Sequence, residues 1–159
     1  MINRWWCAAA LLLAACSGGG GGGTSQVAPA NTATAAVQNF MKAVADSNLT
    51  TMASLWGTSS GPAGKTRQPP DYERRIAVMQ AYLNHDDFRI LSDVPDGSET
   101  RRAMQVQIRR QACTWDIPVT VIQMADGTWL INRVDLGAAG NPAKPCDPSA
   151  KDTASAPSP

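Results

Sequence analysis

The stretch "WDIPVTVIQMADGTWLINRVDL", residues 115–136, decides the fold class of this chain. Apolar, β-branched and aromatic side chains dominate residues 115–124 and 128–136, and this composition is typical of strands. The pair Asp126-Gly127 between them tolerates positive φ, which favours a tight turn. The stretch therefore predicts an antiparallel hairpin.

Two further strands are predicted before this hairpin. Residues 88–94 alternate apolar and polar side chains, and Pro95-Asp96-Gly97-Ser98 is expected to turn the chain. Residues 101–111 form the next strand, and Pro118 in the third strand predicts an edge position or a bulge. In the second strand, Met104, Val106 and Ile108 face one way, and Ala103, Gln105, Gln107, Arg109 and Gln111 face the other. A strand of this kind is buried on one face and solvated on the other.

Three amphipathic helices are predicted before the strands, over residues 35–45, about 49–56 and about 71–84. Asn48 is expected to cap the second helix, and Gly57 to end it in the left-handed conformation. The core-facing residues are Val37, Phe40, Met41 and Val44 in the first, Leu49, Met52, Leu55 and Trp56 in the second, and Tyr72, Ile76, Met79, Tyr82 and Leu83 in the third.

Residues 59–70, between the second and third helices, lack periodicity and predict a loop. Three helices followed by four antiparallel strands predict an α+β fold, with the helices packed on one face of a curved sheet. This order, with "NFMKAVADSNLTTMASLWG" (39–57) and "DGTWLINRVDL" (126–136), resembles the nuclear transport factor 2-like superfamily, whose cone-shaped fold is shared by ketosteroid isomerase and scytalone dehydratase. The nearest alternative is a cystatin-like arrangement with one main helix.

The N-terminus has the features of a secretory leader. Arg4 precedes eleven uncharged residues, 5–15, and a helix of that length rises only about 16 Å, too little to span a bilayer. Leu13-Ala14-Ala15-Cys16 resembles the lipobox of bacterial lipoproteins. The resemblance implies a signal peptide over residues 1–15 and acyl chains, such as palmitate, at Cys16. An ordinary secretory leader with a free Cys16 thiol is the alternative.

The resemblance to lipoproteins also implies a location. Ser17, in place of Asp, implies attachment to the outer membrane of a bacterial envelope, with the domain facing the periplasm. The Gly-rich residues 16–33 then form a linker with a reach of about 20–25 Å. Residues 34–146 form the single domain, and residues 147–159 are expected to be disordered.

The four cysteines divide into two groups. Cys7 leaves with the leader and Cys16 carries lipid, so Cys113 and Cys146 remain as an even pair in an oxidising compartment. We predict that these two form a disulfide, with two free thiols as the alternative. The bond would tie the segment after the last strand to the sheet.

Composition and side-chain spacing limit the chemistry. A net charge of +1 gives no field for binding nucleic acid, and the scattered His, Cys and Asp residues match no metal or cofactor motif. His85, beside Asp86 and Asp87, is expected to complete a helical turn, and Asp116 to lie on the wet face of the sheet. Tyr72 and Tyr82 fit core positions. No catalytic residue is therefore assigned.

We accordingly expect a non-catalytic domain that binds a protein or a small apolar ligand, with Trp56, Tyr82 and Trp129 as the candidate pocket. The alternative is a small isomerase-like or dehydratase-like enzyme that uses the cone cavity, and pairing of sheets in a homodimer is a third hypothesis. A polar sheet face is also predicted, as either a partner surface or a solvated face. Gln105, Gln107 and Arg109 share this face, while Arg101, Arg102 and Arg110 lie in the same strand and Arg89 in its expected neighbour.

Overall fold

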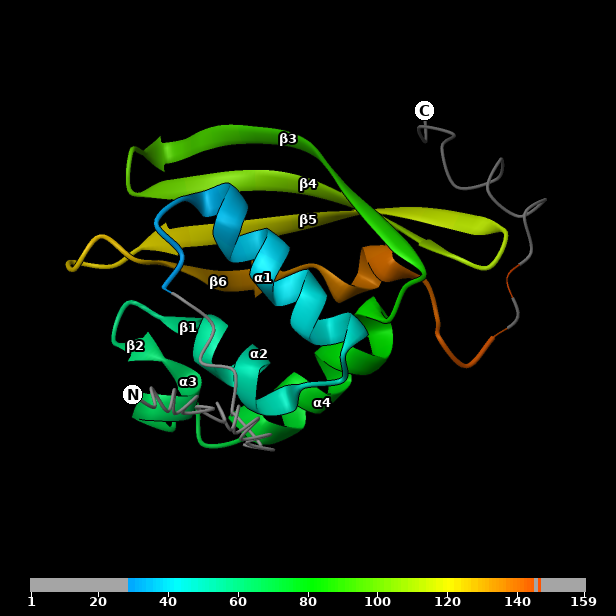
Figure 1. The fold of residues 1–159 in the computed structure, drawn as a ribbon, viewed down its shortest axis with the longest axis horizontal. Coiled ribbons are helices and arrows are strands. Elements are labelled where there is room, and N and C mark those ends of the chain that lie inside the picture. The colour runs from blue at the N-terminus through cyan, green and yellow to red at the C-terminus, as the bar shows by residue number, and fades with distance from the viewer. Residues whose placement is uncertain (1–28, 145, 147–159) are drawn as a thin grey trace, which may run out of the picture.

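The computed structural model describes residues 29–144 and 146, and it has two layers, an antiparallel sheet and a set of helices on one of its faces (Figure 1). The helices are α1 (Ala33–Ala45), α2 (Leu49–Leu55), α3 (Ala63–Thr66) and α4 (Tyr72–Leu83), and a 3-10 turn, η1 (Leu136–Ala139), follows the last strand. The strands are β1 (Gly57–Thr58), β2 (Gly61–Pro62), β3 (Asp87–Ser98), β4 (Arg101–Arg110), β5 (Cys113–Gln123) and β6 (Trp129–Val134). The main sheet has the order β3-β4-β5-β6, so the predicted α+β class with a four-stranded antiparallel sheet is confirmed.

Local sequence signals set the helix starts. The Oγ1 of Thr32 accepts a hydrogen bond from the backbone N–H of Ala35 at 3.0 Å, and Asn48 Oδ1 accepts one from Thr51 at 3.0 Å. Each cap satisfies a backbone donor that the first helical turn leaves without a partner. Asn48 thus caps α2 as predicted. Ala30, a few residues before the expected start of the domain, is buried and accepts a hydrogen bond from Trp129.

The sheet buries one face under the helices. α1 lies across this face (Figure 1), and the β4–β5 register sets Val106 opposite Ile117, both buried. Asp116 is exposed on the other face, as predicted. Pro118 lies in an internal strand, but its carbonyl accepts from Asp135 just beyond the end of β6. The nitrogen and the carbonyl of a strand residue point toward the same neighbouring strand. The nitrogen of Pro118 therefore faces the end of β6, and the lack of an N–H at this position removes no hydrogen bond from the sheet.

Two predicted turns differ from the observed ones. β3 continues through Pro95 with a register shift before Ser98, and the chain turns at Glu99–Thr100. A bulge absorbs the Asp-Gly pair that the sequence suggested as the turn itself. In the β5–β6 hairpin only Gly127 has positive φ (82°), and Asp126 instead accepts a hydrogen bond from the Thr128 N–H at 3.0 Å.

The region after α2 also differs from its prediction. Gly57 does not end α2 in the left-handed conformation, because it begins the short β1–β2 hairpin. Glycine is required there by space, since a Cβ would collide with the carbonyl oxygen of Gly61. The predicted loop over residues 59–70 contains β2 and the single-turn helix α3. Short elements of this kind have too few residues to show a period.

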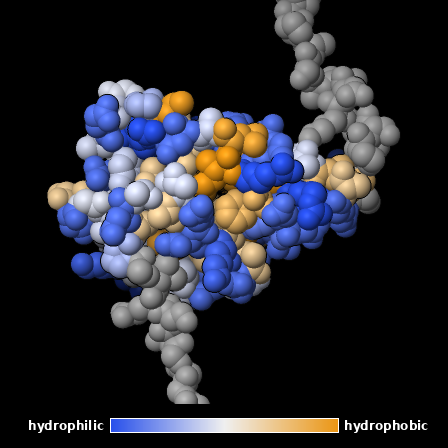
Figure 2. Space-filling view, turned by 45° about the horizontal axis from the view of Figure 1, so that its top comes forward, coloured by the Kyte–Doolittle hydropathy of each residue, from blue (hydrophilic) through white to orange (hydrophobic). Residues whose placement is uncertain are grey.

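β3 is the edge strand at one side of the main sheet. Two large apolar side chains of this strand, Leu91 and Val94, are about half exposed. The view that brings this side forward shows a small hydrophobic patch surrounded by hydrophilic residues (Figure 2). Pro95 and two register shifts interrupt the strand, and such interruptions discourage edge-to-edge pairing.

Candidate functional site

The interior between α1 and the sheet is almost completely filled. It holds a void of about 10 Å³, less than one water molecule needs. All of its lining residues are apolar: Val37, Phe40, Met41, Leu83, Val106, Ile117, Val119, Ile131 and Val134. A ligand cannot enter this space without displacing core side chains.

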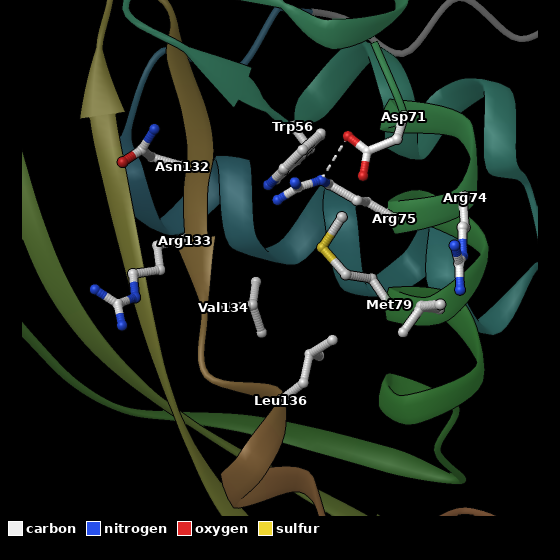
Figure 3. Close-up of a pocket in the computed structure, with 10 residues that line it drawn as sticks. Trp56, Asp71, Arg74, Arg75, Met79, Asn132, Arg133, Val134 and Leu136 are labelled. Atoms are coloured by element: carbon white, nitrogen blue, oxygen red, sulfur yellow. Dashed lines mark hydrogen bonds and ion pairs between the residues drawn. The ribbon is translucent and has the colours of Figure 1, made fainter. Parts of the chain in front are cut away.

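A second space, which we call the α4–β6 groove, lies on the outside of the core between α4, β6 and η1 (Figure 3). Its volume is about 340 Å³. Trp56 and the Asp71–Arg75 pair lie at one end, and Met79, Val134 and Leu136 lie at the other. The remaining lining residues are Arg74, Val78, Asn132 and Arg133. The groove therefore joins a polar end to an apolar end.

The backbone of Trp56 is fixed on both sides. Its N–H donates to Met52 at 2.9 Å, its carbonyl accepts from Ala63 at 2.8 Å, and it forms a bridge with Ile131 of β6. The residue has extended dihedral angles (φ −110°, ψ 141°), so the helix ends here and the side chain leaves α2 toward the groove. These contacts fix the backbone position from which the indole ring extends.

Asp71 and Arg75 lie one helical turn apart on α4. The Arg75 Nε donates to Asp71 Oδ1 at 2.9 Å, and both side chains are about half exposed. This hydrogen bond lowers the pKa of the Asp71 carboxyl below its ordinary value of 3.8. Asp71 is therefore a carboxylate at neutral pH, and it is a weak proton acceptor.

The other charged residues of the groove lie at its margin. Arg74 stays on the outer side of α4, and Arg133 extends away from Trp56 (Figure 3). Neither arginine side chain has a hydrogen bond or ion pair with any of the described residues. Three arginines against one aspartate give the lining an excess of positive charge.

The structure separates the three aromatic residues of the predicted pocket. Trp56 lines the groove, but Tyr82 and Trp129 do not. Tyr82 is half-buried on α4, and its carbonyl accepts a hydrogen bond from Arg110. Trp129 is buried at the start of β6, where its N–H donates to Ala30. The sequence pattern identified Trp56 but missed the Asp71–Arg75 pair, because an i,i+4 ion pair looks like ordinary helix-surface patterning.

His85 and Tyr72 have structural contacts. The Nδ1 of His85 lies 2.8 Å from the Leu83 carbonyl, and its ring meets Phe88 edge to face. The Tyr72 hydroxyl donates to Glu73 at 2.9 Å, and this bond raises the pKa of Tyr72 above its ordinary value of 10.0. Neither residue lines the α4–β6 groove.

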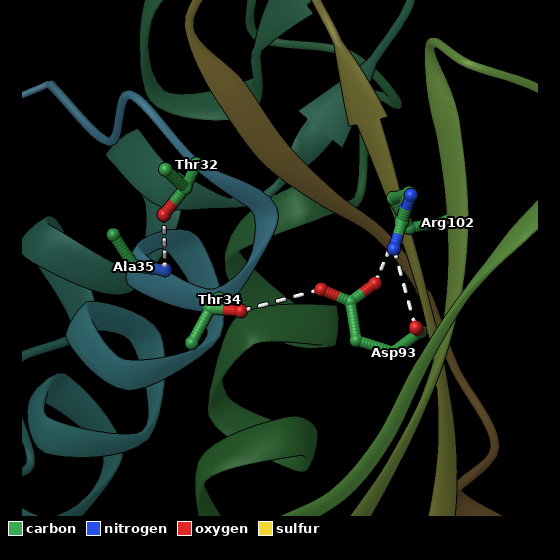
Figure 4. Close-up of polar contacts among 5 residues, drawn as sticks. All are labelled: Thr32, Thr34, Ala35, Asp93 and Arg102. Atoms are coloured by element: carbon green, nitrogen blue, oxygen red, sulfur yellow. Dashed lines mark hydrogen bonds and ion pairs between the residues drawn. The ribbon is translucent and has the colours of Figure 1, made fainter.

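The arginines of the sheet do not share one face. Arg102 donates to the Asp93 carboxylate at 2.6 Å on the helix side, where Thr34 of α1 also contacts Asp93 (Figure 4). Arg110 also points to the helix side and lies 4.6 Å from the Trp115 ring. Arg101 pairs with Asp96, Arg109 lies 3.7 Å from Asp86, and Arg89 opposes Gln107. The arginines of these two strands are therefore divided between the two faces, while Gln105, Gln107 and Arg109 share the face away from the helices.

Cys113 and Cys146 form a disulfide, as predicted, with their Cα atoms 6.0 Å apart. The bond links the start of β5 to the chain beyond η1. Among residues 29–144 and 146, no three His, Cys, Asp or Glu side chains are grouped closely enough to hold a metal ion.

The lipid-attachment prediction falls on residues that the structure leaves undescribed. Cys16, the signal peptide over residues 1–15, most of the linker and the tail over residues 147–159 lie outside the described part of the chain. Each helix within that part is too short or too polar to cross a membrane.

No protein-family model matches this sequence, and no curated protein sequence matches it either. A solved structure described as an NTF2-like transpeptidase from Campylobacter jejuni superposes on the chain with a TM-score of 0.45 at 15% sequence identity. The match covers 61% of this chain and 94% of the other. A match at this score does not bear on the function of the chain.

Proposed function

We propose that the chain is a lipoprotein of the bacterial envelope whose NTF2-like domain binds a small apolar ligand in the α4–β6 groove without catalysing a reaction. The contrast between a filled interior and an open external groove carries this proposal. The order of helices and strands supports an NTF2-like fold. The lipobox sequence supports attachment at Cys16 to the outer membrane, with the domain facing the periplasm.

The size and lining of the groove favour ligand binding. Its volume, about 340 Å³, lies at the lower end of the range of small-molecule sites, which is roughly 300–1,000 Å³. Trp56 and Met79 are buried apolar walls, and Val78 on the rim is 41% exposed. An apolar ligand that covers these side chains gains about 25 cal/mol for each Å² of apolar surface removed from water.

The same residues argue against catalysis. A cone-type enzyme needs an ionisable group inside its cavity, and the interior void is lined by apolar side chains alone. In the groove, Asp71 has a lowered pKa and is therefore poorly suited to accept a proton at neutral pH. This pair is suited to binding rather than to general acid–base chemistry.

Titration of the purified full chain with octan-1-ol tests ligand binding, with the change in total tryptophan emission as the signal, since Trp56 lines the groove. We expect a saturable change, which Val78→Phe weakens at least threefold because the larger side chain occupies the rim. Leu91→Phe is the matched control, since Leu91 is also exposed but lies on β3. An unsaturable response, or equal effects of the two variants, would contradict the proposed site.

Attachment is tested separately in bacteria that express the chain. Radiolabelled palmitate should enter the wild-type protein and fail to enter Cys16→Ser. Equal labelling of both proteins, or none in either, would remove the anchor from the proposal. The groove would be unaffected by that result.

A further inference from the structure

We infer that the ligand of the α4–β6 groove carries a carboxylate, which Trp56 and Arg75 bind together while an apolar chain lies against Met79, Val134 and Leu136. This inference rests on the proposed function and names the ligand class of the same site. It depends on hydrogen-bond donors that the protein itself leaves unused.

The first unused donor is the indole N–H of Trp56. The side chain is 8% exposed, yet no hydrogen bond from this group to any described residue is present. Among the described residues, every side-chain nitrogen or oxygen that solvent cannot reach has a hydrogen-bond partner. The indole N–H is therefore accessible, and Figure 3 shows it turned toward the groove that Arg75 also lines. An accessible donor without a partner, in a residue that is otherwise buried, can form a hydrogen bond with a ligand that supplies an acceptor.

The second set of donors belongs to the guanidinium of Arg75. Only its Nε hydrogen bond to Asp71 is present, so the terminal nitrogens have no acceptor among the described residues. The bond to Asp71 also holds the guanidinium plane in place. Arg75 and Trp56 line the same groove, and both side chains extend into it in Figure 3. Arginine binds carboxylates with two parallel N–H donors, and these charge-assisted bonds are about twice as strong as neutral ones.

The opposite end of the groove defines the rest of the ligand. Met79, Val134 and Leu136 supply no hydrogen-bonding side chain apart from the weak thioether acceptor, so this end favours hydrocarbon. A molecule with one carboxylate and an alkyl or similar apolar chain satisfies both ends. A cationic head group would instead meet the positive charge of Arg75 and be repelled.

Isothermal titration calorimetry on the full chain tests this with three probes of equal chain length: octanoate, octan-1-ol and octylamine. We expect octanoate to bind about tenfold more tightly than octan-1-ol, and octylamine to bind more weakly than either. Equal binding of octanoate and octan-1-ol would overturn the carboxylate inference and leave the proposed function standing. If none of the probes binds, both fail.

Two tryptophan variants locate the effect. Trp56→Phe should reduce octanoate affinity about fivefold to tenfold and change octan-1-ol affinity less than twofold, because only the carboxylate needs the indole N–H. Trp129→Phe is the matched control, since Trp129 is also 8% exposed but lies outside the groove. Arg75→Gln, at a half-exposed position that tolerates substitution, should give a loss at least as large. An equal loss in both tryptophan variants, or an unchanged affinity in Arg75→Gln, would overturn the inference.

Discussion

The interior and the α4–β6 groove share Val134 as a wall, yet one is filled and the other is open. The difference comes from α4, which has two neighbouring stripes of side chains. Its buried stripe, Tyr72, Ile76, Met79 and Leu83, packs into the core. The adjacent stripe mixes Asp71 and Arg75 with Val78, and these side chains stay partly exposed. Packing α4 closely against β6 would remove the charges of Asp71 and Arg75 from water. This desolvation costs more free energy than the added apolar contact would provide.

The largest change in the free energy of unfolding is expected for a substitution in the core. Phe40→Ala removes a ring that is 1% exposed and should lower the free energy of unfolding by about 3–5 kcal/mol. Val78→Ala, at the rim of the groove, should change it by less than about 0.5 kcal/mol. Urea denaturation of both variants measures the contrast. Similar losses in the two would mean that the groove is part of the core.

Loss of the disulfide is expected to cause the second largest change in the free energy of unfolding. Cys146→Ser opens a loop with a sequence separation of 33 residues and should lower the free energy of unfolding by about 3–4 kcal/mol. The affinity of the groove for octan-1-ol should stay within twofold, because Leu136 lies well before Cys146 in the chain. Wild-type protein with the bond reduced is the control and should unfold like the variant. A variant as stable as the oxidised wild type would contradict the prediction.

The packed half of the molecule could be predicted from the sequence because its elements are periodic. Met104, Val106 and Ile108 alternate along β4, and Val37, Phe40 and Val44 recur along α1, so each pattern identifies the buried face. The pairing of Cys113 with Cys146 followed from the number of cysteines. These signals depend on neighbours within one element.

The groove could not be predicted in the same way, because its walls come from segments far apart in the sequence. Trp56 precedes Asn132 by 76 positions, and only the meeting of α2 with β6 brings them together. In the sequence, nothing distinguishes Arg75 from a solvated helix residue. Tyr82 and Trp129 have the same aromatic character as Trp56, but the fold places them elsewhere. Position in three dimensions, which residue type does not encode, separates the groove residues from those of the core.

Arg110 connects two walls of the groove, α4 and η1. Its guanidinium donates to the Tyr82 carbonyl at the end of α4 at 3.1 Å and to the Ala139 carbonyl of η1 at 3.0 Å. Arg110→Met should therefore lower the free energy of unfolding by about 1–3 kcal/mol and weaken octan-1-ol binding. Arg109→Met, at an exposed neighbouring position, is the control for calorimetry and denaturation. Unchanged binding in Arg110→Met would show that the walls hold their spacing without it.

The smallest effect on stability is expected at Asp71. Because Arg75 lowers the pKa of this carboxyl in the folded state, the charged form stabilises the fold above the ordinary value of 3.8. That stabilisation is lost as the pH falls through the lower folded-state pKa. The stability difference between the wild type and Asp71→Asn should therefore be constant at neutral pH and disappear in acid, as denaturation at several pH values would measure.

Asp71→Asn also separates the two ways in which this residue acts on a ligand. Its carboxylate repels an anionic ligand, but its hydrogen bond orients the Arg75 guanidinium. Asparagine keeps an acceptor oxygen and removes the charge. We therefore expect octanoate affinity to rise and octan-1-ol affinity to stay unchanged in calorimetric titrations at neutral pH. A fall in octanoate affinity would mean that orientation of Arg75 by the charged carboxylate outweighs the repulsion, and the groove would then require the intact ion pair.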